Sequence, residues 1–276
     1  MGLDVYKLTS FPKESYGGNE AGVVLDADFL SDKQMLKIAS DIGFSETAFV
    51  SKSKVADFRV RFFTPTNEVP LCGHATIATF NLLRDKSIIN NGFYTQETNA
   101  GILKLDVKQS MVYMEQNTPI YGEVIDFSDI SKCFFNFDYI NQELPTVILS
   151  TGMREIFLPI VSNLELNNLI PNFEEIIKIS KKYNVIGIHA FSLSEGVIDA
   201  YGRNFAPLVG IDEESATGTS NGALGCYLNK YVNHDKTEFT LRQGYSMNKP
   251  SEIVTKLDIK NNKVSSVWVG GSAKIL

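Results

Sequence analysis

The chain is poor in the residues that build disulfide frameworks and metal sites, since its 276 residues include three cysteines and three histidines. The cysteines, at positions 72, 133 and 226, are odd in number and lack CxxC spacing, so we expect neither a disulfide framework nor a zinc site. The histidines form no HxxxH or HExxH pair, which predicts no metal centre. Such cysteine usage is typical of a reducing compartment, and we expect a cytoplasmic protein.

Long apolar runs and clustered positive charge are also missing. No run of 18 apolar residues occurs, and the first residues lack the apolar segment of a signal peptide, so no membrane span is expected. The net charge is −6 and lysine and arginine are scattered, whereas nucleic-acid binding needs a clustered basic face. An anionic small molecule stays compatible with this charge, because local backbone dipoles can outweigh a mild global charge.

What is present indicates a globular protein of mixed strand and helix. The length allows one large domain or two of about 130–140 residues. In the first half, the apolar spacing predicts strands over 4–9, 22–25, 47–51 and 57–63, and helices over 33–41 and 74–83. In the second half it predicts helices over 173–183 and 219–231, and strands over 187–193, 197–204 and from 264 to 268.

The two halves repeat each other at a nearly constant offset. Phe63-Thr64-Pro65 is matched 142 residues later by Phe205-Ala206-Pro207, and Ala48-Phe49 is matched at the same offset by Ala190-Phe191. Lys37-Ile38 recurs after 141 residues and Gly73 after 145. We therefore predict two similar domains, residues 1–115 and 116–261, with a last strand at about 262–276 returning to the first. Equivalent loops of such a pair are expected to face one cleft, a preferred place for a ligand.

Glu46 is the first candidate for chemistry. It directly precedes the apolar segment Thr47-Ala48-Phe49-Val50, and a carboxylate held against apolar walls can exchange protons near neutral pH. The alternative is an exposed carboxylate at the end of a strand. The residue at the equivalent position of the second half is Ile188, so only one of the two halves carries a carboxylate there. A reaction that needs a single acid/base group needs it in one half only, and this difference between the halves favours a function for Glu46.

Gly73-His74 stands at the predicted start of a helix, where free backbone amides can bind an anion. His74 is interpreted as a hydrogen-bond donor or proton shuttle, with a capping or core histidine as the alternative. The neighbouring Cys72 is a candidate thiol, because a helix start lowers a thiol pKa, but a small buried side chain is the commoner fate of a free cysteine.

The equivalent loop of the second half runs from Glu213 to Gly222 and reads as an anion-binding turn with Thr219 or Ser220 as the helix N-cap. Ordinary capping is the alternative interpretation. The glycine spacing matches neither GxxxxGK[ST] nor GxGxxG, so nucleotide binding is not expected.

Five segments, spread over nearly the whole chain, carry a family resemblance. They are GGNEAGVVLDA (17–27), SETAFV (45–50), RFFTPTNEVPLCGHATIA (61–78), ESATGTS (214–220) and QGYSMNKPS (243–251). In these segments the chain resembles the phenazine-biosynthesis PhzF-like family, which is similar in fold to diaminopimelate epimerase and proline racemase. The resemblance implies an α+β fold of two such domains, each a mixed, mostly antiparallel sheet around a central helix, with the active site in the interdomain cleft. It also implies that no cofactor is used and that the protein is a homodimer.

The resemblance further implies roles for particular residues. Glu46 would move a proton between carbons of the substrate, with His74 and an acidic residue of the second loop assisting. Glu214 and Thr219 stand where the family usually has aspartate and serine, and Thr217 stands where related epimerases carry a second cysteine. The implied substrate-binding positions are Asn19, Gly73, Ala75, Gly218, Thr219 and Ser220.

Three functions follow as hypotheses. The first is an isomerase that moves a proton between carbons of a small carboxylate-bearing substrate by general acid/base catalysis. The second is an epimerase or racemase of an amino acid or hydroxy acid that uses Cys72. The third is a metabolite-binding protein on the same fold without catalytic activity.

Overall fold

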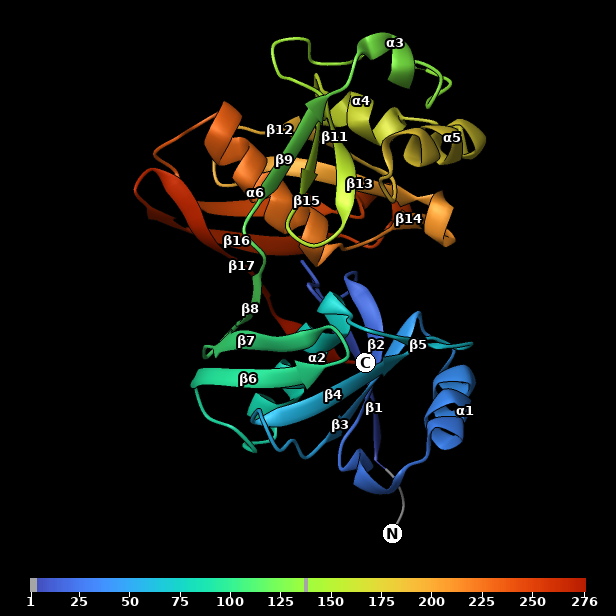
Figure 1. Cartoon of the computed structure of the whole chain (residues 1–276), viewed down its shortest axis with the longest axis vertical. Helices are drawn as coiled ribbons and strands as arrows, with labels where there is room; N and C mark the ends of the chain where they lie inside the picture. Colours follow the sequence, from blue (N-terminus) through green and yellow to red (C-terminus); the bar gives the residue numbers. More distant parts are fainter. Residues whose placement is uncertain (1–3, 137–138) are drawn as a thin grey trace. The chain divides into compact units, whose positions relative to one another are not determined.

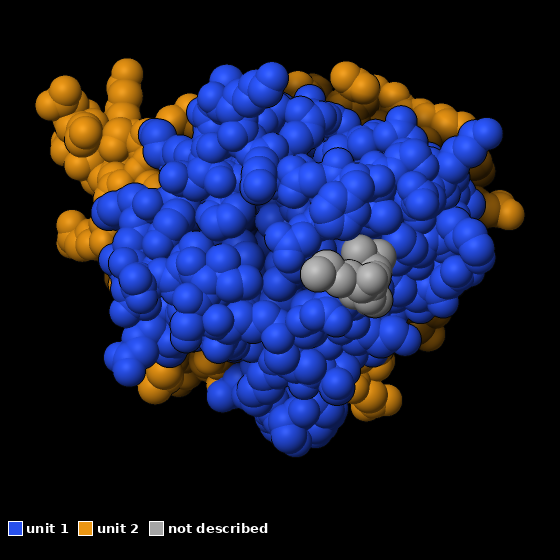
Figure 2. All heavy atoms as spheres, turned by 90° about the horizontal axis from the view of Figure 1, so that it is seen from below, with its two compact units in different colours: residues 1–115, 270–276 blue, residues 116–269 orange. Residues whose placement is uncertain are grey.

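A computed structural model describes residues 4–136 and 139–276 (Figure 1). The chain divides into two compact units, coloured separately in Figure 2: unit 1 is residues 1–115 with 270–276, and unit 2 is residues 116–269. The segment that rejoins unit 1 begins at Gly270, later than the expected residue 262. The reason is that most of the strand β17 (Lys263–Gly271) belongs to unit 2. No helix in the described ranges is long and apolar enough to cross a membrane.

Unit 1 is built around one buried helix, α2 (Gly73–Asp85), in which residues 74–83 are all buried. Antiparallel pairs join β1 to β2, β1 to β18, β3 to β4, β4 to β5, β6 to β7 and β7 to β8, while β2–β3 and β4–β6 are parallel. The strands are β1 (Val5–Ser10), β2 (Asn19–Val24), β3 (Glu46–Ser51), β4 (Phe58–Phe63), β5 (Glu68–Val69), β6 (Gly92–Thr98), β7 (Gly101–Val107), β8 (Val112–Gln116) and β18 (Ala273–Ile275). A second helix, α1 (Asp32–Ile42), and a short 3-10 turn, η1 (Ala27–Phe29), lie between β2 and β3 in the chain.

Unit 2 has the same plan around the buried helix α6 (Gly218–Tyr231). Its strands are β9 (Ile120–Val124), β10 (Val147–Ser150), β11 (Arg154–Ile160), β12 (Ile188–Leu193), β13 (Ala200–Ala206), β14 (Ile211–Glu214), β15 (Glu238–Gln243), β16 (Ser251–Lys260) and β17. The other helical segments are α3 (Phe127–Ile130), α4 (Asn163–Asn168), α5 (Phe173–Tyr183), η2 (Pro207–Val209) and η3 (Tyr245–Met247). The parallel pairs β11–β12 and β13–β15 correspond to β2–β3 and β4–β6 of unit 1.

A matching ion pair shows the repeat at the level of side chains. In unit 1, Arg61 on β4 makes two parallel hydrogen bonds of 2.7 Å to the carboxylate of Glu68. In unit 2, Arg203 on β13 makes two bonds of 2.8 Å to Glu213 in the same way. The arginines are 142 residues apart and the glutamates 145, which are the offsets read from the sequence. Glu213 is therefore a structural partner of Arg203, which leaves Glu214 as the acidic candidate of this loop.

The predicted helices are confirmed to within two residues, and local signals explain their ends. The backbone amide of Ser31 donates to Gln34 Oε1 (2.9 Å) at the start of α1, and Gly43 ends it with φ of 75°. The predicted N-cap of α6 is wrong, since the cap is Thr217 and not Thr219 or Ser220. The amide of Asn221 donates to Thr217 O (3.1 Å), so the cap lies two residues before Thr219.

Candidate active site

The parallel pairing of β2 and β3 assembles the candidate site of unit 1. Ala21 lies opposite Glu46, so the N-terminal ends of both strands lie side by side at the same end of the sheet. The central helix α2 packs against both strands and begins at Gly73, directly after its N-cap Cys72. Asn19, Glu46, Cys72 and His74 are thereby brought together from three elements.

His74 is the centre of this cluster. Its Nε2 lies 3.4 Å from Glu46 Oε2 and 3.5 Å from Ser45 Oγ. Its Nδ1 lies 3.4 Å from Asn19 Nδ2 and 3.4 Å from Cys72 Sγ. Asn19, Glu46 and His74, predicted as site residues, therefore share one cluster, and Ser45, which was not predicted, joins it. Ser45 precedes Glu46 in the chain and lies in the segment SETAFV (45–50), one of those that carry the family resemblance.

Burial sets the charge of this cluster. The side chain of His74 is 5% exposed, and desolvation lowers its pKa below the usual value, although the charge of Glu46 and a hydrogen bond with the backbone of Glu20 act in the opposite direction. The imidazole is therefore neutral near pH 7. A neutral imidazole can accept or donate a hydrogen bond without adding a competing positive charge beside Glu46.

Glu46 has one carboxylate oxygen that accepts no hydrogen bond from the described residues. Its side chain is 18% exposed, and Oε2 is buried without a hydrogen-bond donor among the described residues. At 3.4 Å the contact with His74 Nε2 is electrostatic but longer than a normal hydrogen bond. Since no donor occupies this oxygen in the described part of the chain, its lone pairs are unused within this cluster.

The start of α2 supplies backbone donors beside this carboxylate. The first intrahelical hydrogen bond runs from Thr76 N to Cys72 O (3.1 Å), so helix geometry offers the amides of Gly73 and Ala75 no acceptor. Ala75 is fully buried and can contribute only its amide. A Cβ added at Gly73 would lie 3.6 Å from Met114 Cε, an ordinary contact, so packing does not require glycine there.

The predicted residues of unit 2 gather at the start of α6. Thr217, which is 145 residues after Cys72 and is its counterpart in the repeat, donates its hydroxyl proton to Glu214 Oε2 (2.7 Å). Gln243 on β15 fixes this turn: its Nε2 donates to Glu214 O (2.6 Å) and its Oε1 accepts from Thr217 N (3.2 Å). Gln243 was missed as a functional candidate, although it lies in one of the segments that carry the family resemblance.

Ser220 belongs to a buried polar network of unit 2. Its hydroxyl bonds to Glu155 Oε2, and Asn204 Nδ2 donates both to Glu155 Oε1 (2.6 Å) and to Ser220 Oγ (3.1 Å). The side chain of Ser220 is therefore used inside the unit, and only its amide remains for the predicted ligand contact. Gly218 is likewise buried, whereas Thr219 is half-buried.

Glu155 and His189, whose Nδ1 lies 3.3 Å from Asn204 Nδ2, are buried ionisable groups of this network that the sequence did not single out. Glu155 is 1% exposed, and burial raises the pKa of its carboxyl, while the bonds to Ser220 and Asn204 act in the opposite direction. Burial lowers the pKa of His189 to about 3, so its ring is neutral. Burial therefore favours the uncharged form of both groups.

Glu46, Cys72 and His74 each carry a potential metal ligand, so we asked whether the three side chains could bind one metal ion together. One ligand atom from each lies within 4.8 Å of the others. However, Cys72 Sγ is 3.9 Å from His74 Nε2 and only 3.4 Å from Nδ1, which places the sulfur beside the ring and off the lone-pair axis of Nε2. A metal on Nε2 beside Glu46 could not reach this thiol in the observed arrangement, so these residues do not fit a chelate.

The comparisons with known proteins agree with this architecture. A family model described as phenazine biosynthesis-like protein matches residues 8–276. An uncharacterized isomerase of Clostridium acetobutylicum is 35% identical over 99% of this chain and 96% of its own length. The crystal structure of a Bacillus anthracis phenazine biosynthesis protein of the PhzF family is 30% identical, with a TM-score of 0.90 over 100% of this chain and 98% of that one.

A more distant structure shares only the fold. The hydroxyproline epimerase of Agrobacterium vitis is 12% identical, with a TM-score of 0.62 over 99% of this chain and 90% of that one. The predicted epimerase-like α+β fold is therefore confirmed.

Proposed function

Because the chain belongs to the phenazine biosynthesis-like (PhzF) family, we propose that it is an isomerase that moves a proton between carbon atoms of a small carboxylate-bearing substrate. The observation that carries this proposal is the buried Oε2 of Glu46, which has no hydrogen-bond donor among the described residues and lies 3.4 Å from the neutral ring of His74. The names of the relatives, uncharacterized isomerases, support the reaction class.

In the proposed reaction Glu46 is the general base and then the general acid. Its carboxylate takes the proton from a C–H bond, and the electron pair of that bond moves into the adjacent unsaturated or carboxyl-bearing system. The protonated Glu46 exchanges its proton with solvent and then gives a proton to a different carbon, so the product has the composition of the substrate and no external acid, base or oxidant is consumed. General acid–base catalysis of this kind typically contributes about 10²–10⁴-fold to the rate.

The neighbouring groups have supporting roles in this proposal. The amides of Gly73 and Ala75 bind the substrate carboxylate, since they are helix-start donors without an intrahelical acceptor. His74 and Asn19 hold Glu46 and the substrate in place through the ring contacts described above. In unit 2, we assign Glu214 a role in polarising the substrate, and the first-turn amides of α6 at Gly218, Thr219 and Ser220 a role in binding it.

The proposal is tested by hydrogen exchange, an experiment that works even when the natural substrate has not been identified. Small unsaturated and amino-substituted carboxylic acids are incubated with the protein in D₂O and examined by proton NMR. We expect at least one acid to show deuterium at a carbon position or a shifted double bond. Ligands that bind, as shown by thermal stabilisation, but never exchange a carbon-bound proton would support the non-catalytic binding protein instead.

The epimerase alternative has one observation in its favour, the 3.4 Å contact between Cys72 Sγ and His74 Nδ1. Against it, the equivalent position in unit 2 is Thr217, whose hydroxyl donates to Glu214. A Cys72→Ala variant separates the two. Our proposal predicts that it retains most of the exchange activity, and loss of activity in Cys72→Ala with retention in Cys226→Ala would favour the thiol. The expected homodimer is tested separately by sedimentation.

A further inference from the structure

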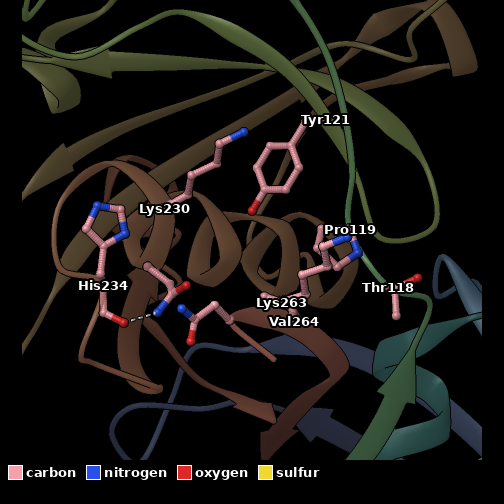
Figure 3. A pocket seen from close by; sticks show the side chains of 9 residues that line it. Thr118, Pro119, Tyr121, Lys230, His234, Lys263 and Val264 are labelled. Atoms are coloured by element: carbon pink, nitrogen blue, oxygen red, sulfur yellow. Dashed lines mark hydrogen bonds between the residues drawn. The ribbon is translucent and has the colours of Figure 1, made fainter. Parts of the chain in front are cut away.

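A pocket of about 580 Å³ opens on unit 2, away from the start of α6 (Figure 3). It lies at the last turn of α6, ten residues or about 15 Å along the helix from Ser220. We name it the basic pocket; the residues that line it are Thr118, Pro119, Tyr121, Asn229, Lys230, His234, Asn262, Lys263 and Val264. We propose that the basic pocket binds the phosphate group of a small phosphate monoester.

The charge of the lining is the first argument. Two lysines and a histidine line the pocket, and none of its nine lining residues is aspartate or glutamate, although the chain has 32 acidic residues against 26 basic ones. Among the described residues, neither Lys230 nor Lys263 forms an ion pair. The positive charge of this pocket is therefore uncompensated by the described part of the protein, which is the condition for attracting a dianion.

The position of Lys230 is fixed without being neutralised. Its Nζ lies 3.7 Å from the centre of the Tyr121 ring and 5.1 Å from that of Tyr231. The Tyr121 hydroxyl donates to Cys226 O (3.1 Å), so the hydroxyl is directed at the helix backbone and the ring face is left to the lysine. Figure 3 shows the amino end of Lys230 beside this ring. A cation–π contact orients an ammonium group but leaves its N–H donors for a ligand.

The other two basic groups come from short, constrained turns. Asn229 Nδ2 donates to the carbonyl oxygens of His234 (3.0 Å) and Lys236 (2.9 Å), which holds the loop after α6 in place. Asn261 and Asn262 have φ of 51° and 58°, the conformation of a tight hairpin turn, and Lys263 follows directly. The positions of all three basic residues are thus set by the fold.

The apolar part of the lining indicates an ester and not a free phosphate ion. Pro119, Tyr121 and Val264 form a wall that can cover a ring or hydrocarbon group, as in typical ligand pockets. The C-terminal end of α6 carries a partial negative charge of about half an elementary charge, and the full positive charge of Lys230 in the last turn outweighs it.

The test uses the histidine ring signals of ¹⁵N-labelled protein. Of the three histidines only His234 lines the pocket, while His74 and His189 are buried elsewhere, and a His234→Gln variant assigns its signal. Phenyl phosphate and inorganic phosphate are titrated at fixed ionic strength and pH. We expect a saturable shift of the His234 signal alone, with tighter binding of phenyl phosphate than of inorganic phosphate.

Matched variants locate the interaction. Replacing both lysines (Lys230→Ala with Lys263→Ala) should weaken phenyl phosphate binding by about tenfold or more, as expected for losing charged hydrogen-bond donors. The control replaces the exposed lysines Lys33 and Lys181 and should bind as the wild type does. If the double variant does not fold, Lys263→Ala alone, which leaves the tyrosine contact intact, gives the same comparison.

Two results would overturn the proposal: a shift of the His234 signal that stays linear in phosphate concentration, or equal affinity in the pocket and control variants. Equal affinity for the two phosphates would refute the ester assignment.

Discussion

Glu155 offers a sharp test of how a buried carboxyl governs the stability of unit 2. The carboxyl is 1% exposed, its oxygens contact Ser220 and Asn204, and burial raises its pKa. Between the ordinary glutamate pKa of about 4.3 and the raised value, the folded state keeps a proton that the unfolded state has lost. The stabilisation that this carboxyl contributes is therefore fully present below the ordinary pKa. It decreases as the pH rises from the ordinary pKa to the raised pKa, by up to about 1.4 kcal/mol per pH unit.

A Glu155→Gln variant should remove this pH dependence while keeping the hydrogen bonds. The glutamine oxygen can accept from Asn204 in place of Glu155 Oε1, and the Ser220 hydroxyl, which donates to Glu155 Oε2 in the structure, can rotate to accept from the glutamine amide. At neutral pH we therefore expect the variant to be as stable as the wild type or more stable. Glu155→Ala leaves two buried polar groups without this partner, at about 1–3 kcal/mol each, so we expect a loss of about 2–6 kcal/mol.

The assay is urea unfolding at several pH values between 5 and 8, followed by tryptophan fluorescence. The chain has a single tryptophan, Trp268 on β17, which reports on unit 2. The difference between wild type and Glu155→Gln isolates this one carboxyl from all others. Equal pH slopes for the two proteins, or a glutamine variant as unstable as the alanine variant, would refute the reasoning.

Three further predictions concern packing and the site. Gly73→Ala should change the free energy of unfolding by no more than about 1 kcal/mol, because the new Cβ would contact only Met114 Cε, at 3.6 Å. The same variant should weaken ligand binding or turnover. A large loss of stability in urea unfolding would contradict this. Arg203→Ala should cost about 3–5 kcal/mol because it leaves Glu213 without its two bonds in a largely buried pair, whereas Lys37→Ala, which breaks the exposed pair with Asp41, should cost at most about 1 kcal/mol by the same assay. In an NMR titration the His74 ring should become protonated only below pH 6.5, because burial lowers its pKa. Protonation at or above pH 6.5 would show that the charge of Glu46 outweighs the effect of burial on this pKa.

The sequence predicted those parts of the fold that depend on local signals. The four long helices follow from apolar spacing and caps, and the repeat follows from short matches at one offset, now seen in the pairs Arg61–Glu68 and Arg203–Glu213. The strand β9 was not predicted because its residues are mostly exposed and show no alternation, so only its pairing with β10 makes it a strand.

The candidate site was predictable where its residues are close in the chain and not where contacts are distant. Glu46, His74 and Gly73 lie in recognisable segments at the starts of β3 and α2. The N-cap of α6 was misplaced because Thr217, Thr219 and Ser220 are all good caps, and the choice is made by Gln243, 26 residues away, which accepts the Thr217 amide. The partner of Ser220 is 65 residues away in Glu155, and no local pattern marks such a contact.

Deuterium incorporation by a Glu46→Gln variant tests the central claim most directly. With an acid that the wild type exchanges in D₂O, glutamine keeps the size of the side chain but cannot take a proton from carbon, so we predict a rate lower by about 10²–10⁴-fold with ligand binding retained. Glu195→Gln, which changes an exposed glutamate in a turn of unit 2, is the matched control and should exchange at the wild-type rate. Full exchange by Glu46→Gln would contradict the account, because the proton would then be moved by another group.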